Sequence, residues 1–189
     1  MLKILEKLRK SGRAAFSTKE YSFLLGKKGY ARLQLHRAKN KGEIVKIKNG
    51  WWAFPDAMAE AVACEISNPC YLSFHSALYL HGLTTQIPNS VQLAVARKPR
   101  NYTVLGTKVR EFRIKKGSFT GFYRKENLLL ASMEKAFADA LTLPRTCPEI
   151  VLVESSKSVD ISKVPALLRS MAAKTRLKKV IKDAGKERA

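Results

Sequence analysis

The spacing of apolar and polar positions predicts three short helices near the N-terminus. The first covers about residues 2–10, where leucines recur every third residue before Ser11-Gly12 ends the pattern. The second begins at the N-cap Ser17, because Glu20 stands three residues on as in a capping box, and it ends at Gly26. The third spans about residues 29–41 and is closed by Gly42.

The third helix has two different sides when each residue is rotated by about 100°. The inward side carries Ala31, Leu35 and Ala38. The outward stripe carries Lys28, Arg32, His36 and Lys39. Small residues at two of the three inward positions let this helix lie close to its neighbours, as in a helix-turn-helix.

A β-hairpin is predicted directly after the third helix. Asn49-Gly50 lies at the centre of IVKIKNGWWAF and is the strongest short-range hairpin signal in the chain. A two-residue turn there pairs Lys48 with Trp51, Ile47 with Trp52 and Val45 with Phe54. Alternation then puts Val45, Ile47, Trp52 and Phe54 on one apolar face, and Lys46, Lys48 and Trp51 on the other.

The rest of the chain mixes helices and strands. An Ala-rich helix follows Pro55-Asp56, and a short helix capped by Ser73 ends at Gly82. Strands are expected over residues 91–96, 102–105, 108–114, 120–123 and 149–155. Further helices are expected from Ser132 through Leu141 and from Val159 to about Ala184, with Pro165 in a first turn.

These elements predict an α+β protein. Residues 1–56 form an N-terminal winged helix-turn-helix domain and residues 57–69 a connecting helix or linker. Residues 70–189 form a mixed α/β C-terminal domain with a small, mostly antiparallel sheet.

The net charge of +21 indicates a polyanionic partner. Charge alone does not choose among nucleic acid, an acidic membrane surface and an acidic protein. Residues 1–56 carry 14 basic and 4 acidic side chains, and the segment from Lys27 to Lys41 holds six Lys or Arg residues without an acid. On a helix followed by a basic hairpin this segment favours duplex DNA, the plainer alternative being a solvated surface.

The predicted DNA-contacting residues are Lys27, Lys28, Arg32, His36, Arg37, Lys39, Lys46, Lys48 and Trp51. Arg32 is the best candidate for a bidentate contact to guanine in the major groove, while Lys46 and Lys48 would hold phosphates. Two of these residues have an alternative role: Trp51 as a cap on the small domain's core, and His36 as a spacer on the polar side.

Catalytic and metal chemistry lack a matching pattern. The spacing of Cys64 and Cys70, like that of His75 and His81, misses the short intervals of zinc modules, and GKKG is not a phosphate loop. We therefore expect no enzyme activity, no metal and no cofactor. Glu134 and Asp139 are assigned to salt bridges or capping, with a partner surface as the alternative.

Cellular location follows from the N-terminus and the cysteines. MLKILEKLRKSG is too charged for a secretory segment, and three cysteines make no disulfide framework. Because the apolar runs are also too short to span a membrane, a cytoplasmic protein without membrane contact is expected.

Three longer segments carry a more specific resemblance: NGWWAFP, YLSFHSALYLHGLTTQIPNSVQLAV and LLLASMEKAFADAL. In this order they resemble the AbiEi family of antitoxins and transcriptional regulators, which are found beside nucleotidyltransferase toxins in abortive-infection operons. The similarity covers most of residues 1–142. The last 45 or so residues match only in being helical.

The resemblance implies an autoregulator that binds inverted repeats in its own promoter and an antitoxin that counteracts a nucleotidyltransferase toxin. A solitary relative that retains only DNA binding fits equally well, and so does a general double-stranded DNA or RNA binder. No coiled-coil seam is present, so a monomer that pairs on its DNA site is expected.

Overall fold

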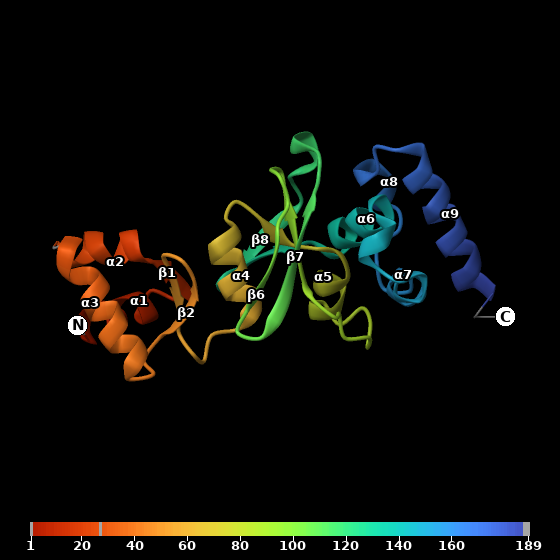
Figure 1. Ribbon diagram of the computed structural model, residues 1–189. Helices are drawn as coiled ribbons and strands as arrows, with labels where there is room; N and C mark the ends of the chain where they lie inside the picture. Colours follow the sequence, from red (N-terminus) through yellow and green to blue (C-terminus); the bar gives the residue numbers. More distant parts are fainter. Residues whose placement is uncertain (1, 27, 187–189) are drawn as a thin grey trace.

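The computed structural model describes residues 2–26 and 28–186 of the chain. It is an α+β structure in which a small helical part with a three-stranded sheet is followed by a six-stranded sheet and a group of C-terminal helices (Figure 1). The three parts lie side by side in the order of the sequence (Figure 1). The expected α+β class is confirmed.

The N-terminal elements agree closely with the hydrophobic pattern. They are α1 (Leu2–Lys10), β1 (Ala15–Ser17), α2 (Thr18–Leu25), α3 (Lys28–Asn40), β2 (Val45–Lys48) and β3 (Trp51–Ala53). The Ser17 hydroxyl accepts a hydrogen bond from the Glu20 amide at 3.1 Å, which confirms the predicted N-cap of α2. Gly26 ends α2 in the left-handed region at φ 70°, where a side chain would be strained.

The small sheet has the order β1-β3-β2, and its strands β1 and β3 pack against a core on each face. Phe16 and Trp52 point into a core shared with the N-terminal helices, while Ala15 and Ala53 belong to the core of the rest of the molecule. Because alanine is small, α4 (Ala59–Ser67) packs closely on this second face. The helix expected to be a connector therefore contributes to the larger core.

The predicted register of the hairpin was wrong beyond its first pair. Lys48 pairs with Trp51 as expected, but Lys46 pairs with Trp52 and Val45 with Ala53, and a bulge lies between Lys46 and Lys48. Ile47 consequently packs on the larger core rather than beside Trp52. Simple alternation fails here because the bulge shifts the register and because Ile47 and Trp51 pack on the larger core while Trp52 packs on the N-terminal one.

The larger sheet has the order β6-β7-β5-β4-β9-β8. Its strands are β4 (Tyr71–Leu72), β5 (Val91–Val95), β6 (Asn101–Val104), β7 (Thr107–Arg113), β8 (Phe122–Lys125) and β9 (Leu128–Ala131). β5 pairs in parallel with β7, and β4 with β9, while the other three pairings are antiparallel. The sheet is therefore mixed, and larger than the small sheet expected.

The remaining helices are α5 (Phe74–Leu80), α6 (Met133–Thr142), α7 (Glu149–Ser156), α8 (Val164–Leu167) and α9 (Met171–Lys186). The strand expected over residues 149–155 was wrong, because this segment is α7 and packs against α9. Ser132 caps α6 as predicted, and Pro165 lies in the first turn of α8. Across the described residues, no helix combines the length and the apolar character that a membrane span needs.

Ser73 precedes α5 without capping it through its side chain. Its hydroxyl instead donates to Asp139 Oδ2 at 2.8 Å, beside the hydroxyl of Tyr71 at the same distance from that oxygen. The Lys135 ammonium lies 2.6 Å from Asp139 Oδ1, so α6 brings an ion pair into the core. Asp139 thus takes the salt-bridge role expected from the sequence.

Candidate nucleic-acid interface

Helix α3 is anchored by a narrow stripe and exposes the rest of its surface. Ala31, Leu35 and Ala38 are fully buried. Arg32, His36 and Lys39 are all exposed, on another side of the helix. This separation confirms the predicted division of the helix, and it leaves a basic surface free for a partner.

The angle between α2 and α3 is held by polar contacts as well as by packing. The buried Tyr21 on α2 donates its hydroxyl proton to Gln34 Oε1 on α3 at 2.7 Å. Burial raises the pKa of Tyr21, and the nearby Glu43 carboxylate raises it further, so the hydroxyl stays protonated as a donor. The contact fixes α3 relative to the helix that precedes it.

Several exposed residues of this surface were not predicted. Tyr30 and Leu33 stand out from α3, and Phe23 of α2 is 85% exposed. Arg37 donates a hydrogen bond to the Tyr30 hydroxyl at 3.4 Å. A hollow of about 420 Å³ lies along α3 and is lined by Tyr30, Gln34, Arg37, Asn40 and Lys41. Phe23, Tyr30 and Leu33 interrupt the polar pattern of this surface in the sequence, and that interruption was the available signal for exposed apolar side chains here.

The two hairpin lysines have different surroundings. Lys46 is exposed, whereas Lys48 is half-buried with its ammonium 5.4 Å from the centre of the Tyr102 ring and 5.9 Å from that of Trp51. Burial lowers the pKa of Lys48, and the positive Arg100 and Arg97 lower it further against the attraction of Glu111. Lys48 therefore lies where the hairpin meets the larger sheet.

Trp51 lies on the same side of the hairpin. Its half-buried ring packs on the larger core, while the core under the N-terminal helices takes Trp52 instead. The alternative role considered for Trp51, a cap on the small domain's core, is wrong in this respect. The structure groups Trp51 and Lys48 at the junction with β6.

Two of the predicted contact residues have no described side chain. Lys27 lies outside the described residues, and Lys28 is described only as the first residue of α3. The residues that the structure does bring to the exposed surface of α3 and β2 are Arg32, His36, Arg37, Lys39 and Lys46.

Beside Lys48, the buried carboxylate of Glu111 accepts hydrogen bonds from two segments, the end of α4 and the loop between β5 and β6. It accepts hydrogen bonds from Arg97 at 2.6 and 2.8 Å, from the Ser67 hydroxyl at 2.6 Å and from the Arg100 amide at 2.9 Å. Burial alone would raise the pKa of Glu111, but these donors outweigh burial and lower the pKa to about 2. Glu111 thereby compensates one of the two positive charges of Arg97 and Arg100.

The lowered pKa of Glu111 predicts a loss of stability in acid. The carboxylate stabilises the fold fully above its unfolded pKa near 4.5, and this contribution should disappear as the pH falls toward about 2. Urea unfolding of the Glu111→Gln protein should therefore show a flatter pH dependence in this window, and the exposed Glu6→Gln control should behave as the wild type. If the Glu111→Gln protein lost stability with falling pH as steeply as the wild type, a group other than Glu111 would be responsible for the acid dependence.

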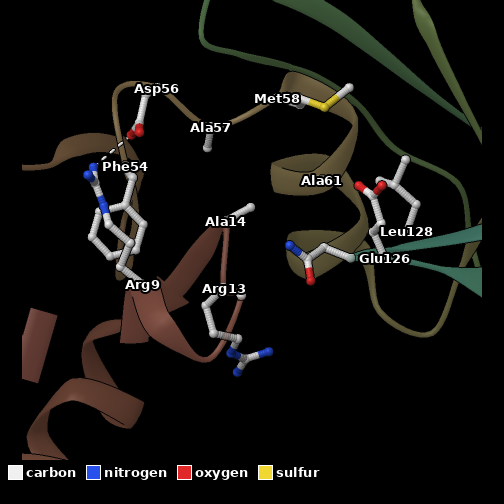
Figure 2. A pocket seen from close by; sticks show the side chains of 12 residues that line it. Arg9, Arg13, Ala14, Phe54, Asp56, Ala57, Met58, Ala61, Glu126 and Leu128 are labelled. Carbon is white, nitrogen blue, oxygen red and sulfur yellow. Dashed lines mark hydrogen bonds and ion pairs between the residues drawn. The ribbon is translucent and has the colours of Figure 1, made fainter. Parts of the chain in front are cut away.

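On another side of the junction, α1 and the loop before α4 border a pocket of about 190 Å³ (Figure 2). Arg9 lies over the Phe54 ring and pairs with Asp56 at 2.7 Å, as Figure 2 shows. Arg13 forms ion pairs with Glu20 and Glu65 and so ties α2 to α4. The guanidinium of Arg13 is already paired with two carboxylates. We therefore assign Arg13 a structural role and do not count it among the candidate nucleic-acid contacts.

The histidines and cysteines considered for metal binding have other partners. His75 Nε2 lies 2.9 Å from the Gln86 carbonyl oxygen, and His81 Nε2 lies 2.8 Å from that of Ala131. The Cys70 thiol donates to the Cys64 carbonyl. Within the described ranges, no three His, Cys, Asp or Glu side chains gather as a metal site would require.

Comparison with known proteins adds evidence on the fold. No family model and no curated protein matches the sequence. The chain is similar to the crystal structure of the RV2827C protein from Mycobacterium tuberculosis, with a TM-score of 0.68 over 96% of this chain and 76% of that chain. The likeness shows a shared fold. At 15% identity it carries no conclusion about activity or partners.

Proposed function

We propose that the chain is a sequence-specific, DNA-binding transcriptional regulator in which residues 1–56 act as a winged helix-turn-helix. The observation that carries this proposal is the exposed stripe of Arg32, His36 and Lys39 on a helix anchored by small residues. The order of three helices and a hairpin supports it, because this arrangement presents its third helix to the major groove.

The two kinds of contact have different roles in this proposal. Arg32 would donate two hydrogen bonds to guanine, and this contact would give sequence preference. Lys39 on α3 and Lys46 on β2 are exposed cations that would bind phosphates. Phosphate contacts supply affinity and salt dependence but little preference.

The biological role proposed is that of an autoregulator and antitoxin. The resemblance of residues 1–142 to AbiEi proteins supports it, with inverted repeats in the promoter as the DNA site and a nucleotidyltransferase as the toxin. The protein is expected to be a monomer in solution that pairs on DNA. Co-expression with the neighbouring toxin gene tests the antitoxin role: rescued growth supports it, and unrelieved toxicity contradicts it.

A general DNA or RNA binder is the second candidate. The exposed rings of Phe23 and Tyr30 favour it, because proteins that bind single strands stack bases on aromatic side chains. Basic residues outside the first 56 favour it too, since they supply about half of the net charge. This candidate predicts affinity without preference for one sequence.

Footprinting on the DNA upstream of the gene, across a salt series, separates the two candidates. Protection of paired half-sites that survives moderate salt is expected for the regulator. Uniform coating that disappears as salt rises, or equal affinity for single-stranded RNA, would instead identify the general binder.

The hairpin lysines make a matched pair for a second test. Lys46→Ala should weaken cognate and unrelated DNA alike and reduce the slope of log K against log salt by about 0.9, because one phosphate contact is lost. Lys48→Ala should reduce the slope by less, since its ammonium lies against Tyr102 and Trp51. Fluorescence anisotropy across salt concentrations measures both. A larger effect at Lys48 would show that the half-buried lysine is the one at the phosphate.

A further inference from the structure

A further polar cavity lies far from α3, between the α5–β5 loop, β7 and the turn before α7. Its volume is about 400 Å³, in the range of small-ligand pockets. The walls come from three segments distant in sequence: Gln86, Ile87 and Asn89 in the loop, Arg110 on β7, and residues 144–148. None of the lining side chains is acidic.

The floor of this cavity is held by buried polar groups. Gln92 Oε1 accepts a hydrogen bond from the His75 amide at 3.0 Å, and Gln92 Nε2 donates to the Thr146 carbonyl at 2.7 Å. The ring of His75 in turn lies 2.9 Å from the Gln86 carbonyl oxygen. Gln92 and His75 are 4% and 6% exposed, so these contacts join the walls in a preformed arrangement.

Two arginines line the cavity without a carboxylate partner. Arg110 and Arg145 are both exposed, and among the described residues neither has an acid within ion-pair distance. The Arg110 guanidinium lies over the ring of Phe112, 5.4 Å from its centre, a contact that leaves its N–H donors without a carboxylate. Arg97 and Arg100, by contrast, share Glu111. The acid that acts on His75 is Glu154, which is held by the Thr84 hydroxyl at 2.6 Å and the Thr85 amide at 3.2 Å. The cavity therefore has uncompensated positive charge that suits an anion.

The apolar part of the lining indicates a ligand that has an apolar portion as well as an anionic group. Ile87 is 77% exposed at the rim, and Pro144 and Pro148 line the same cavity. Apolar side chains of this kind can pack against the ring of a nucleobase, and side-chain amides such as those of Gln86 and Asn89 can pair with its polar edge. A neighbouring hollow of about 580 Å³ shares Asn89 and Arg110 and adds Lys108, which leaves room for sugar or further phosphate.

We propose that this cavity binds a nucleoside phosphate, with its phosphate on Arg110 and Arg145 and its base between Ile87 and the two prolines. Planar guanidinium groups bind phosphate through paired hydrogen bonds, so two arginines without a carboxylate partner in one cavity are a suitable phosphate site. The site lies in the second part of the molecule and does not depend on DNA binding by residues 1–56.

Isothermal titration of the full chain with adenosine monophosphate and guanosine monophosphate tests the proposal. At least one should bind, and Arg145→Ala and Arg110→Ala should each weaken it about tenfold, the effect of losing one charge-assisted contact. Arg113→Ala is the matched control, because it removes an exposed arginine from the same strand β7 but outside the cavity. This variant should bind as the wild type.

Inorganic phosphate and adenosine separate the contributions of the two ends of the ligand, and both should bind more weakly than the nucleotide. Equal affinity for inorganic phosphate would overturn the assignment of a base site, and equal affinity for adenosine would overturn the phosphate site. An absence of nucleotide binding, or equal weakening by Arg113→Ala, would overturn the proposal as a whole. Because Arg110 and Arg145 are exposed, thermal unfolding of their variants should match the wild type and show that the fold is kept.

Discussion

The Asp139→Ala protein should lose about 3–5 kcal/mol of its free energy of unfolding, the largest stability effect we expect from a single charged residue here. Asp139 and Lys135 are 5% and 3% exposed and lie 2.6 Å apart. Removing the carboxylate leaves the Lys135 ammonium buried without its counter-ion and takes the acceptor from the hydroxyls of Tyr71 and Ser73. Burial raises the pKa of Asp139, and the Lys135 charge and the hydroxyl donors oppose this rise.

Urea unfolding measures this loss. Two further variants show whether it comes from the burial of the ion pair. Glu149→Ala breaks the exposed pair with Lys179 and should cost less than about 1 kcal/mol. Changing both buried partners, as in Lys135→Met with Asp139→Leu, should recover much of the stability, because the cost lies in leaving one charge alone. A cost at Asp139 as small as that at Glu149 would contradict the burial of this pair.

Local signals predicted the helices of residues 1–56 well. The capping pair Ser17 and Glu20, the glycine ends and the 3.6-residue spacing in α3 act within one or two turns, so they are visible in the sequence. Other elements depend on distant partners. β1 and β4 are strands of three and two residues that exist only because β3, β5 and β9 pair with them.

Residues 149–155, which were expected to form a strand, also show that a local pattern does not settle an element that depends on distant partners. Ile150, Val151, Leu152 and Val153 form a continuous apolar run, which is typical of a buried strand. In the structure this run is the helix α7, with Val151, Leu152 and Val153 buried and Ile150 exposed. Packing against α9 decided between two structures that the short pattern left open.

In the candidate interface, too, local features could be predicted from the sequence and contacts between distant segments could not. The exposed side of α3 could be derived from rotation about one helix, and it was confirmed. The surroundings of Lys48 and Trp51 could not be derived from the sequence, because Tyr102, Arg97 and Arg100 lie about fifty residues further along the chain. The buried Asp139 network and the cavity between β7 and the turn before α7 likewise join segments that no local pattern connects. DNA binding itself stays a prediction.

Arg32→Ala should weaken binding to a cognate site by about 1–3 kcal/mol and relax the preference at one base position, because a bidentate contact to guanine is specific for that base. Arg37→Ala is the matched comparison: it lies on the same helix, but its guanidinium is turned to the Tyr30 hydroxyl. We expect Arg37→Ala to weaken all sequences alike. Affinities measured by anisotropy on DNA substituted at each position test both variants, and thermal unfolding should be unchanged because Arg32 is exposed. Unchanged affinity and preference in the Arg32→Ala protein would remove Arg32 from the interface, and equal losses on every sequence would make it a phosphate contact instead.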